Sequence, residues 1–225
     1  MKRIAVTRAE PEAAATAERL RALGAAPVPA PLLFITPVAF DADIEGAQAL
    51  LFSSSNGVRA FAAASAARDV AVLAVGDATA QAARKAGFTH VVSADGDVHK
   101  LAALAQRQLD PARGLVLHIS GAHAAGDLKG ALEAAGFRAE RRIAYEARAA
   151  ETLPDAFAGP LDAVLFHSAR AAETFLRLGA PNAEKLTAFC LSQAVADAAS
   201  AAPWRRVIVA PRPREDALLE ATLAG

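Results

Sequence analysis

Short apolar runs alternate with longer amphipathic segments along the whole chain. In the amphipathic segments apolar residues recur at three- and four-residue steps, as Leu101 and Leu104 do, which is typical of helices. Gly24, Gly87 and Gly136 follow three such segments, where a left-handed C-cap is favoured. The apolar runs predict buried strands at Arg3–Thr7, Ala26–Ala30, Ala49–Ser53, Val70–Val75, His90–Ser93, Leu115–Ser120, Ala139–Tyr145, Ala163–His167, Ala188–Leu191 and Arg206–Ala210. This alternation predicts an α/β fold with parallel sheets and helices on both faces.

An internal repeat divides these elements into two similar halves. ALLFSSSNGVRAF, starting at Ala49, resembles AVLFHSARAAETF, starting at Ala163. Two further segment pairs repeat in the same order, at a nearly constant spacing close to half the chain length. Each half has five predicted strands, so we expect two similar domains, each with a five-stranded sheet.

Two extended stretches, Pro31–Val38 and Ala139–Arg148, are longer than a strand-to-helix turn requires. Paired linkers of this kind would let the chain leave one domain, build the other and return. The pattern alone leaves open whether the domains are arranged in tandem or exchange parts.

Charge and composition exclude several classes of protein. The net charge is zero, and residues 39–145 are as balanced as the rest, so the basic excess of a nucleic-acid binder is missing. No apolar stretch reaches the length of a membrane span, and the first residues do not form a signal peptide. Cys190, the only cysteine, lies in the apolar run AFCL and is predicted to be a buried thiol. We therefore expect a cytoplasmic protein.

Candidate chemistry gathers in the turns that follow the predicted strands. In open parallel sheets, ligands bind beyond the carboxyl ends of the strands, where helix N-termini present free N–H groups. The small polar residues of these turns also suit ordinary helix N-caps, so each turn alone has a purely structural explanation. Several such turns together would suit a ligand with many carboxylates. The turns are Thr7-Arg8, Ser53–Asn56, Gly76–Thr79, Ser120-Gly121, Ser168–Arg170 and Ser192-Gln193.

Other constellations carry less weight. No glycine-rich phosphate loop occurs, which argues against a nucleotide cofactor. His118 and His123 have no cysteine or matched acidic residue beside them, so we expect no metal site. His167 precedes Ser168, but no nucleophile elbow accompanies the pair. Tyr145, the only tyrosine, ends a predicted linker strand; its phenol could serve equally as an interface group or as a proton donor.

The chain resembles the uroporphyrinogen-III synthase family over almost its whole length. AVTRAEPEAAATAERLRALGAAPVPAP is similar to the family's opening, and LLFSSSNGV to its apolar strand and serine turn. AVGDATAQAARKAGF resembles its Val-Gly-x-x-Thr-Ala turn. GLVLHISGAHAAGDLKGALEAAGFRAERRIAYEAR resembles its glycine turn and tyrosine-bearing return strand, while AVLFHSARAAETF matches its second serine turn.

The resemblance implies the crossed arrangement of domains. Residues 1–34 and 149–225 would form one domain, residues 39–144 the other, with linkers at about 35–38 and 145–148 forming a two-stranded connection. It also implies that hydroxymethylbilane is cyclised to uroporphyrinogen III, with inversion of the terminal pyrrole, without metal or organic cofactor. We expect the protein to be a monomer.

In the resemblance Tyr145 corresponds to the family's candidate proton donor. The substrate-binding residues that it implies, together with the strand-end turns, are Thr7, Arg8, Ser54, Asn56, Gly76, Thr79, Gly121, Ser168, Arg170 and Ser192. The second Gly-x-x-Thr turn departs from the family pattern, because Ser192 and Val195 stand in it. Two alternatives remain open: a non-catalytic two-domain ligand-binding module and a nucleotide-dependent oxidoreductase or transferase.

Overall fold

The computed structural model describes residues 1–123 and 126–224. Its contacts divide the chain into two compact units. The terminal unit comprises Met1–Phe34 and Arg148–Gly225, and the central unit comprises Ile35–Ala147. None of the described helices combines the length and hydropathy needed to cross a membrane.

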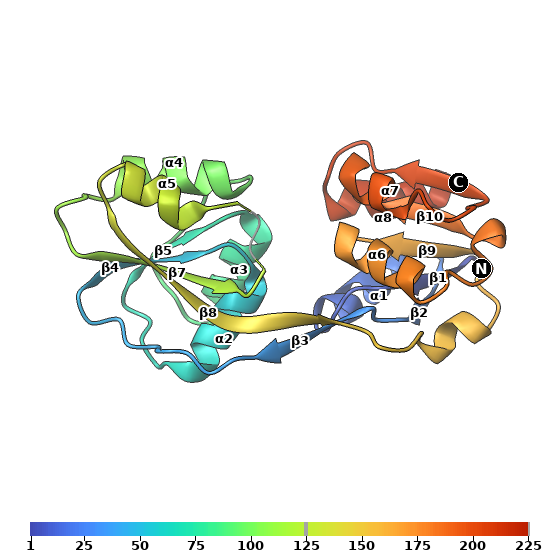
Figure 1. Ribbon diagram of the computed structural model, residues 1–225, viewed down its shortest axis with the longest axis horizontal. Helices are drawn as coiled ribbons and strands as arrows, with labels where there is room; N and C mark the ends of the chain where they lie inside the picture. Colours follow the sequence, from blue (N-terminus) through green and yellow to red (C-terminus); the bar gives the residue numbers. More distant parts are fainter. Residues whose placement is uncertain (124–125, 225) are drawn as a thin grey trace. The chain divides into compact units, whose positions relative to one another are not determined.

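The terminal unit is a five-stranded parallel sheet between two layers of helices. The sheet has the order β11-β10-β9-β1-β2, so blue N-terminal strands lie beside orange and red C-terminal ones in Figure 1. Its strands are β1 (Arg3–Val6), β2 (Ala26–Pro29), β9 (Ala163–Phe166), β10 (Thr187–Cys190) and β11 (Arg206–Val209). Its helices are α1 (Glu12–Ala22), α6 (Ala169–Arg177), α7 (Gln193–Ala199) and α8 (Glu215–Ala224), with short 3₁₀ turns η1 (Asp155–Ala158) and η2 (Ala183–Lys185).

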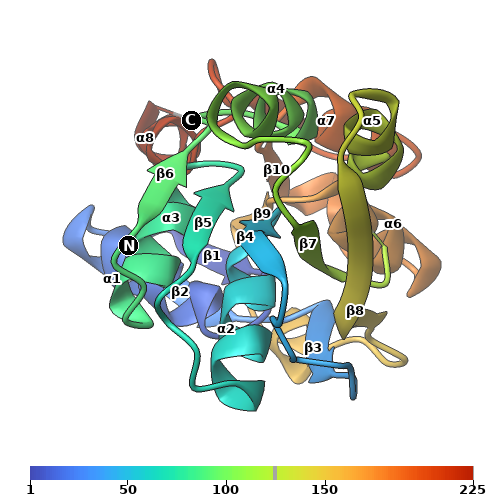
Figure 2. The same ribbon diagram turned by 90° about the vertical axis from the view of Figure 1, so that its left-hand side faces the viewer.

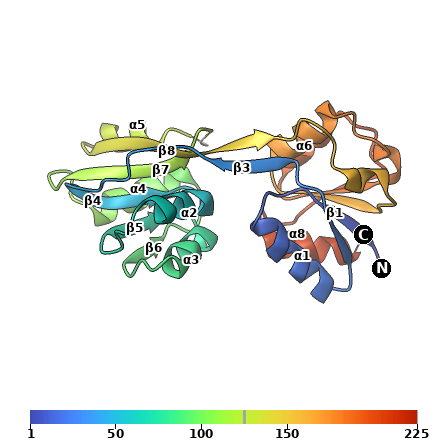
Figure 3. The same cartoon turned by 90° about the horizontal axis from the view of Figure 1, so that it is seen from below.

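Alternation along the strands of the terminal unit supplies both of its cores. Val164 and Phe166 pack with residues of α6 and α7, whereas Leu165 packs on the opposite face with residues of α1 and α8. Figure 3 shows α1 and α8 on one side of this sheet and α6 on the other. A strand must be apolar at every position to be buried on both faces, as the sequence predicted.

The central unit has the same layered design with a larger sheet, in the order β3-β8-β7-β4-β5-β6. Helices α4 and α5 cover one face and α2 and α3 the other, as Figure 2 shows. The strands are β3 (Leu33–Pro37), β4 (Ala47–Phe52), β5 (Ala71–Ala74), β6 (Val91–Ser93), β7 (Leu115–Gly121) and β8 (Arg138–Ala149). The helices are α2 (Ser55–Ala64), α3 (Asp77–Lys85), α4 (Val98–Gln108) and α5 (Leu128–Ala134).

The prediction of five strands in each sheet is wrong for the central unit. The extra strand is β3, which lies in the stretch that the sequence indicated as a linker. Prolines at positions 31 and 37 keep this stretch extended. Strand β8 offers it an unpaired edge, and Val38 N donates a hydrogen bond of 3.0 Å to Ala144 O just beyond β3. An extended segment beside an open strand edge pairs with it, because unpaired backbone groups are costly.

Apart from β3, the two sheets share one topology. The order β8-β7-β4-β5-β6 in the central unit corresponds to β2-β1-β9-β10-β11 in the terminal unit. In the internal repeat, β1 corresponds to β7 and β4 to β9. Each half of the sequence therefore contributes strands to both units, and the repeat boundary does not coincide with the boundary between units.

Candidate functional site

The carboxyl edge of the terminal sheet brings together residues from both ends of the chain. Thr7 and Arg8 follow β1, while His167 and Ser168 follow β9, the strand that pairs with β1. Ser192 follows β10, the next strand along. Parallel neighbours end at the same edge of a sheet, so these five residues share one surface of the unit.

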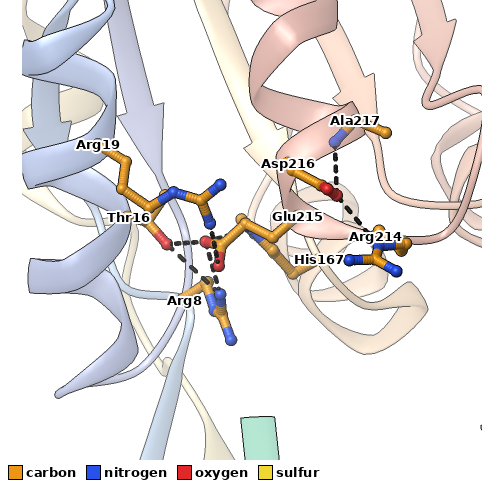
Figure 4. Close-up of polar contacts among 8 residues, drawn as sticks. All are labelled: Arg8, Thr16, Arg19, His167, Arg214, Glu215, Asp216 and Ala217. Atoms are coloured by element: carbon orange, nitrogen blue, oxygen red, sulfur yellow. Dashed lines mark hydrogen bonds and ion pairs between the residues drawn. The ribbon is translucent and has the colours of Figure 1, made fainter. Parts of the chain in front are cut away.

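A carboxylate that the sequence analysis did not single out, Glu215, organises this edge. It is the first residue of α8, and Figure 4 shows the side chains of Arg8, Thr16 and Arg19 converging on it. Arg8 Nη1 lies 2.9 Å from Glu215 Oε1, and Arg19 Nη1 lies 3.0 Å from Oε2. The Thr16 hydroxyl also donates a hydrogen bond to Oε1. Both carboxylate oxygens are thus occupied by donors from the other end of the chain.

The contacts around Glu215 determine its protonation. Burial acts to raise the pKa of this carboxyl group, but His167, Thr16 and Arg8 outweigh it and lower the pKa to about 2. Glu215 is therefore ionised at neutral pH and offsets one of the two arginine charges.

His167 stands beside the carboxylate, with the charges of Arg8 and Arg19 nearby. Its Nε2 lies 3.5 Å from Glu215 Oε1 without hydrogen-bond geometry, and neither ring nitrogen has a hydrogen-bond partner among the described residues. Burial lowers the pKa of His167 below its ordinary value, so the ring is neutral at pH 7. A neutral imidazole without a nucleophile or an orienting hydrogen bond does not form a hydrolytic triad.

The carboxyl edge of the central sheet is built differently. Ser53 and Ser54 follow β4, Gly76 follows β5, and β7 ends in Ser120 and Gly121. Here the charged group is Arg141, in β8, whose guanidinium donates three hydrogen bonds to one short segment: 2.8 Å to Ser120 Oγ, 2.7 Å to Gly121 O and 2.8 Å to Ala122 O. No carboxylate takes part in these bonds.

His118 in β7 is the buried histidine of the central unit. Its Nε2 shares a hydrogen bond of 2.9 Å with Ser53 Oγ, while its Nδ1 has no partner within the described residues. Burial, assisted by the nearby positive charge of Arg141, lowers the pKa of His118 to about 4. The ring is neutral, and its hydrogen bond ties the end of β4 to β7. His118 thus has a structural role at this edge.

Tyr145 lies against Gly121 at the same edge. A Cβ atom added at Gly121 would stand 2.7 Å from two ring carbons of Tyr145 and 3.0 Å from its hydroxyl oxygen. The tyrosine is only 9% exposed. Its phenol therefore packs on the peptide backbone where β7 ends.

The predicted binding residues differ in what they do in the fold. Ser54 and Ser168 cap α2 and α6: Ser54 Oγ accepts from Asn56 N at 3.0 Å and Ser168 Oγ from Ala171 N at 3.2 Å. Ser192 is the N-cap of α7 by position, but its hydroxyl makes no capping bond. Gly76 begins α3 in the same way without a side chain.

The side chains of Thr7, Asn56 and Thr79 have roles within the fold. The buried Thr7 hydroxyl donates to Leu165 O at 2.6 Å, and Asn56 accepts a hydrogen bond from Arg59. Thr79 is 5% exposed, as buried as Val195 at 4%, its counterpart in the repeat. Val195, which stands where the family pattern has threonine, therefore occupies a core position. Arg170 lies in the first turn of α6.

The strand-end pattern located these turns, but it missed Glu215, Arg19, Thr16 and Arg141. The acidic pair that opens α8, directly after an arginine-rich turn, was the available signal for Glu215. Cys190 is buried, as predicted, and burial raises the pKa of its thiol to about 12, which favours the unreactive protonated form. Among the described residues no group of three histidine, cysteine or acidic side chains is placed to hold a metal ion.

Comparison with known proteins identifies the family. The chain matches the family described as uroporphyrinogen-III synthase HemD over residues 14–220. The uroporphyrinogen-III synthetase of Helicobacter pylori 26695 is 16% identical, with a TM-score of 0.71 over 100% of this chain and 99% of that one. A mutant uroporphyrinogen III synthase of the extremely thermophilic bacterium Thermus thermophilus is 21% identical, with a TM-score of 0.57 over 100% and 98%.

No curated protein sequence matches the chain. At these identities the solved structures establish the α/β fold, whereas the family match extends over most of the sequence. The chain belongs to the uroporphyrinogen-III synthase family, whose members are cyclising lyases of porphyrin biosynthesis.

Proposed function

We propose that this chain converts hydroxymethylbilane into uroporphyrinogen III with the strand-end residues described above. The reaction removes the terminal hydroxyl group as water and forms an azafulvene. The substituted carbon of the last pyrrole then attacks, and the resulting spiro intermediate fragments and recloses with that ring inverted. The protein must protonate the leaving hydroxyl, hold charged substrate arms and bring the reacting carbons together.

The position of Tyr145 is the observation that carries this proposal. It is the only tyrosine of the chain, and it packs on the strand-end turn at Gly121. A phenol fixed at the carboxyl end of a parallel sheet is placed where ligands of such sheets bind. Within the described part of the chain its hydroxyl has no hydrogen-bond partner, which suits donation to a substrate oxygen.

The binding groups that we propose are mostly neutral. Gly76, Gly121 and Ser192 present backbone at strand ends or helix starts, and the Ser192 hydroxyl is not used as a cap. Backbone N–H groups at helix starts bind anions without adding net charge, which agrees with the balanced composition. We extend the proposal to Thr7, Arg8, Ser54, Asn56, Thr79, Ser168 and Arg170, whose side chains or backbone lie in the same turns.

Product isomers test the function directly. Purified protein is incubated with enzymatically generated hydroxymethylbilane, and the oxidised porphyrins are separated by chromatography. We expect the type III isomer in excess over a protein-free control, which yields type I by spontaneous closure. Type I alone, at the protein-free rate, would contradict the synthase function and favour the ligand-binding alternative.

Tyr145→Phe tests the proton donor in the same assay. General acid catalysis contributes about 10²–10⁴-fold, so we expect kcat to fall within this range while the fold persists. Single-turnover rates equal to those of the wild type would show that another group supplies the proton.

We also propose a cytoplasmic monomer that needs no cofactor, nucleic acid or membrane. The charge balance in both parts of the sequence supports the exclusion of nucleic acid. Light scattering during size-exclusion chromatography measures the oligomeric state.

A further inference from the structure

An irregularity in β8 determines which residue faces Gly121. Along β7 and β8 the partners advance in step from Leu115 with Arg138 to Ser120 with Ile143. The next pair is Gly121 with Tyr145, so Ala144 is an extra residue. Such a bulge re-aims a side chain, because a shift of one residue exchanges the faces of a strand. Without the bulge, alanine and not tyrosine would stand opposite Gly121.

The backbone on both sides of this bulge is fixed by hydrogen bonds. Ala144 O accepts from Val38 N at 3.0 Å, on the side of β3, and Tyr145 O accepts from Ala122 N at 2.9 Å, on the side of β7. Val38, the residue directly after the edge strand β3, thus holds the carbonyl of the extra residue.

Arg141 fixes the other partner of the contact. Its three hydrogen bonds to Ser120, Gly121 and Ala122 hold the end of β7 against β8. The planar guanidinium can serve a hydroxyl and two carbonyl oxygens at once, whereas a lysine ammonium lacks this fixed fork. Gly121 in turn leaves the space that the tyrosine ring fills.

We infer that Arg141 and Gly121 are positioning residues, which together with the bulge at Ala144 hold the Tyr145 phenol in one place for proton transfer. The catalytic part of this inference rests on the proposed function. The structural part stands on the central unit alone, so the two can be tested separately.

The single tyrosine permits a direct structural test. Protein grown with 3-fluorotyrosine carries fluorine only at position 145, so its ¹⁹F NMR spectrum reports on that side chain. We expect Arg141→Lys and Gly121→Ala each to shift or broaden the signal. Gly121→Ala must displace the ring, because the new Cβ would lie 2.7 Å from its carbons.

Two control variants leave this contact intact. Arg138→Lys changes an exposed arginine at the start of the same strand. Gly159→Ala adds a methyl group 3.6 Å from the nearest atom, which is ordinary contact. Both should keep the wild-type signal. Signals that coincide with the wild type in Arg141→Lys and Gly121→Ala alike would overturn the inference.

Kinetics separate positioning from general stability. A misplacement of about 1 Å can cost on the order of 100-fold in rate, so we expect kcat to fall by about 10–100-fold in both variants. The KM of Arg141→Lys should change far less, because proton donation acts in the transition state. In a Tyr145→Phe background the same substitutions should cause no further loss.

The remaining outcomes are distinct. A displaced signal with unchanged kcat would overturn the positioning role in catalysis. A further loss of kcat in the Tyr145→Phe background would show that Arg141 and Gly121 act independently of the phenol, which also overturns it. Absence of type III product from the wild type would contradict the proposed function, while the NMR comparison would still decide whether Arg141 and Gly121 hold Tyr145.

Discussion

The two units share a sheet topology and an internal repeat, yet their carboxyl edges solve different problems. In the terminal unit a carboxylate, Glu215, joins two arginines from α1 and the turn before it. In the central unit Arg141 bonds only neutral oxygens and supports a tyrosine. At the terminal edge the charged side chains pair with one another, whereas at the central edge Arg141 bonds uncharged oxygens and a tyrosine ring packs on the backbone. Corresponding strand ends of one topology thus carry ion pairs in one unit and a tyrosine packed on backbone in the other.

The histidines show the same contrast. His118 in the central unit is buried and His167 in the terminal unit is largely so, and both have lowered pKa values. His167 has only an ill-aligned carboxylate beside it, while His118 shares a good hydrogen bond with Ser53. Ser53 and His167 occupy corresponding strand ends in the repeat. At this position the terminal unit has an imidazole, whereas the central unit has a hydroxyl that bonds an imidazole from the neighbouring strand.

The largest effect that would sharpen this contrast concerns acid stability. The pKa of His118 is about 4 in the fold against an ordinary value of 6.5. As the pH falls below 6.5 the unfolded chain binds a proton that the folded chain does not, so stability is lost between pH 6.5 and 4. The difference corresponds to about 3 kcal/mol. His118→Gln should remove this part of the pH dependence.

Hydrogen exchange of the strands of the central unit, measured at about pH 7 and about pH 4.5, checks the prediction. As the pH is lowered, the protection of the wild type should decrease more than that of His118→Gln. The strands of the terminal unit serve as an internal control, because His167 is unchanged there. Equal slopes for both proteins would show that His118 is protonated in the fold without penalty.

The next effect concerns the ion pairs of the terminal unit. Glu215→Gln removes the charge that Arg8 and Arg19 share, and we expect a loss of about 1–2 kcal/mol at pH 7, since the group is partly exposed. The pKa of Glu215 is about 2 in the fold against 4.5 ordinarily. Its stabilisation is therefore complete above pH 4.5 and declines as the pH falls towards 2.

Trp204, the only tryptophan, stacks on Phe175 in the terminal unit, so its fluorescence follows the unfolding of that unit. Glu220→Gln, on the exposed face of the same helix as Glu215, is the matched control and should change the midpoint little. If both variants behave alike at pH 7, the carboxylate of Glu215 contributes no net stability and the contrast between the two edges is only geometric.

Much of the fold followed from local patterns in the sequence. All ten predicted strands are present, and Gly24 and Gly136 adopt the left-handed conformation expected after a helix. Strand β3 was missed as a strand because it pairs through an open edge that only the sheet order creates. An edge strand and an extended linker have the same kind of sequence, so the pattern of apolar residues does not distinguish them.

The site was less predictable, for a related reason. Ser54 and Ser168 were found because a cap is defined by residues two or three positions away. Glu215 meets Arg8 across almost the whole chain, and that contact depends on β1 pairing with β9. The contact of Tyr145 with Gly121 depends on a one-residue bulge. Contacts that depend on the order and register of the strands cannot be predicted from residues that are close together in the sequence.

The smallest effect tests whether corresponding turns have the same role. Ser168 caps α6 with a hydrogen bond, and Ser54 does the same for α2, whereas the Ser192 hydroxyl makes no capping bond at α7. Losing a serine cap costs about 1 kcal/mol. Ser168→Ala should therefore lower the stability of the terminal unit by about this amount, followed by Trp204 fluorescence, while Ser192→Ala should leave it nearly unchanged. If the Ser192 hydroxyl binds a substrate arm, Ser192→Ala should instead raise KM. Equal losses of stability in the two variants would mean that Ser192 is an ordinary cap, and the serine turns would then have one role in both units.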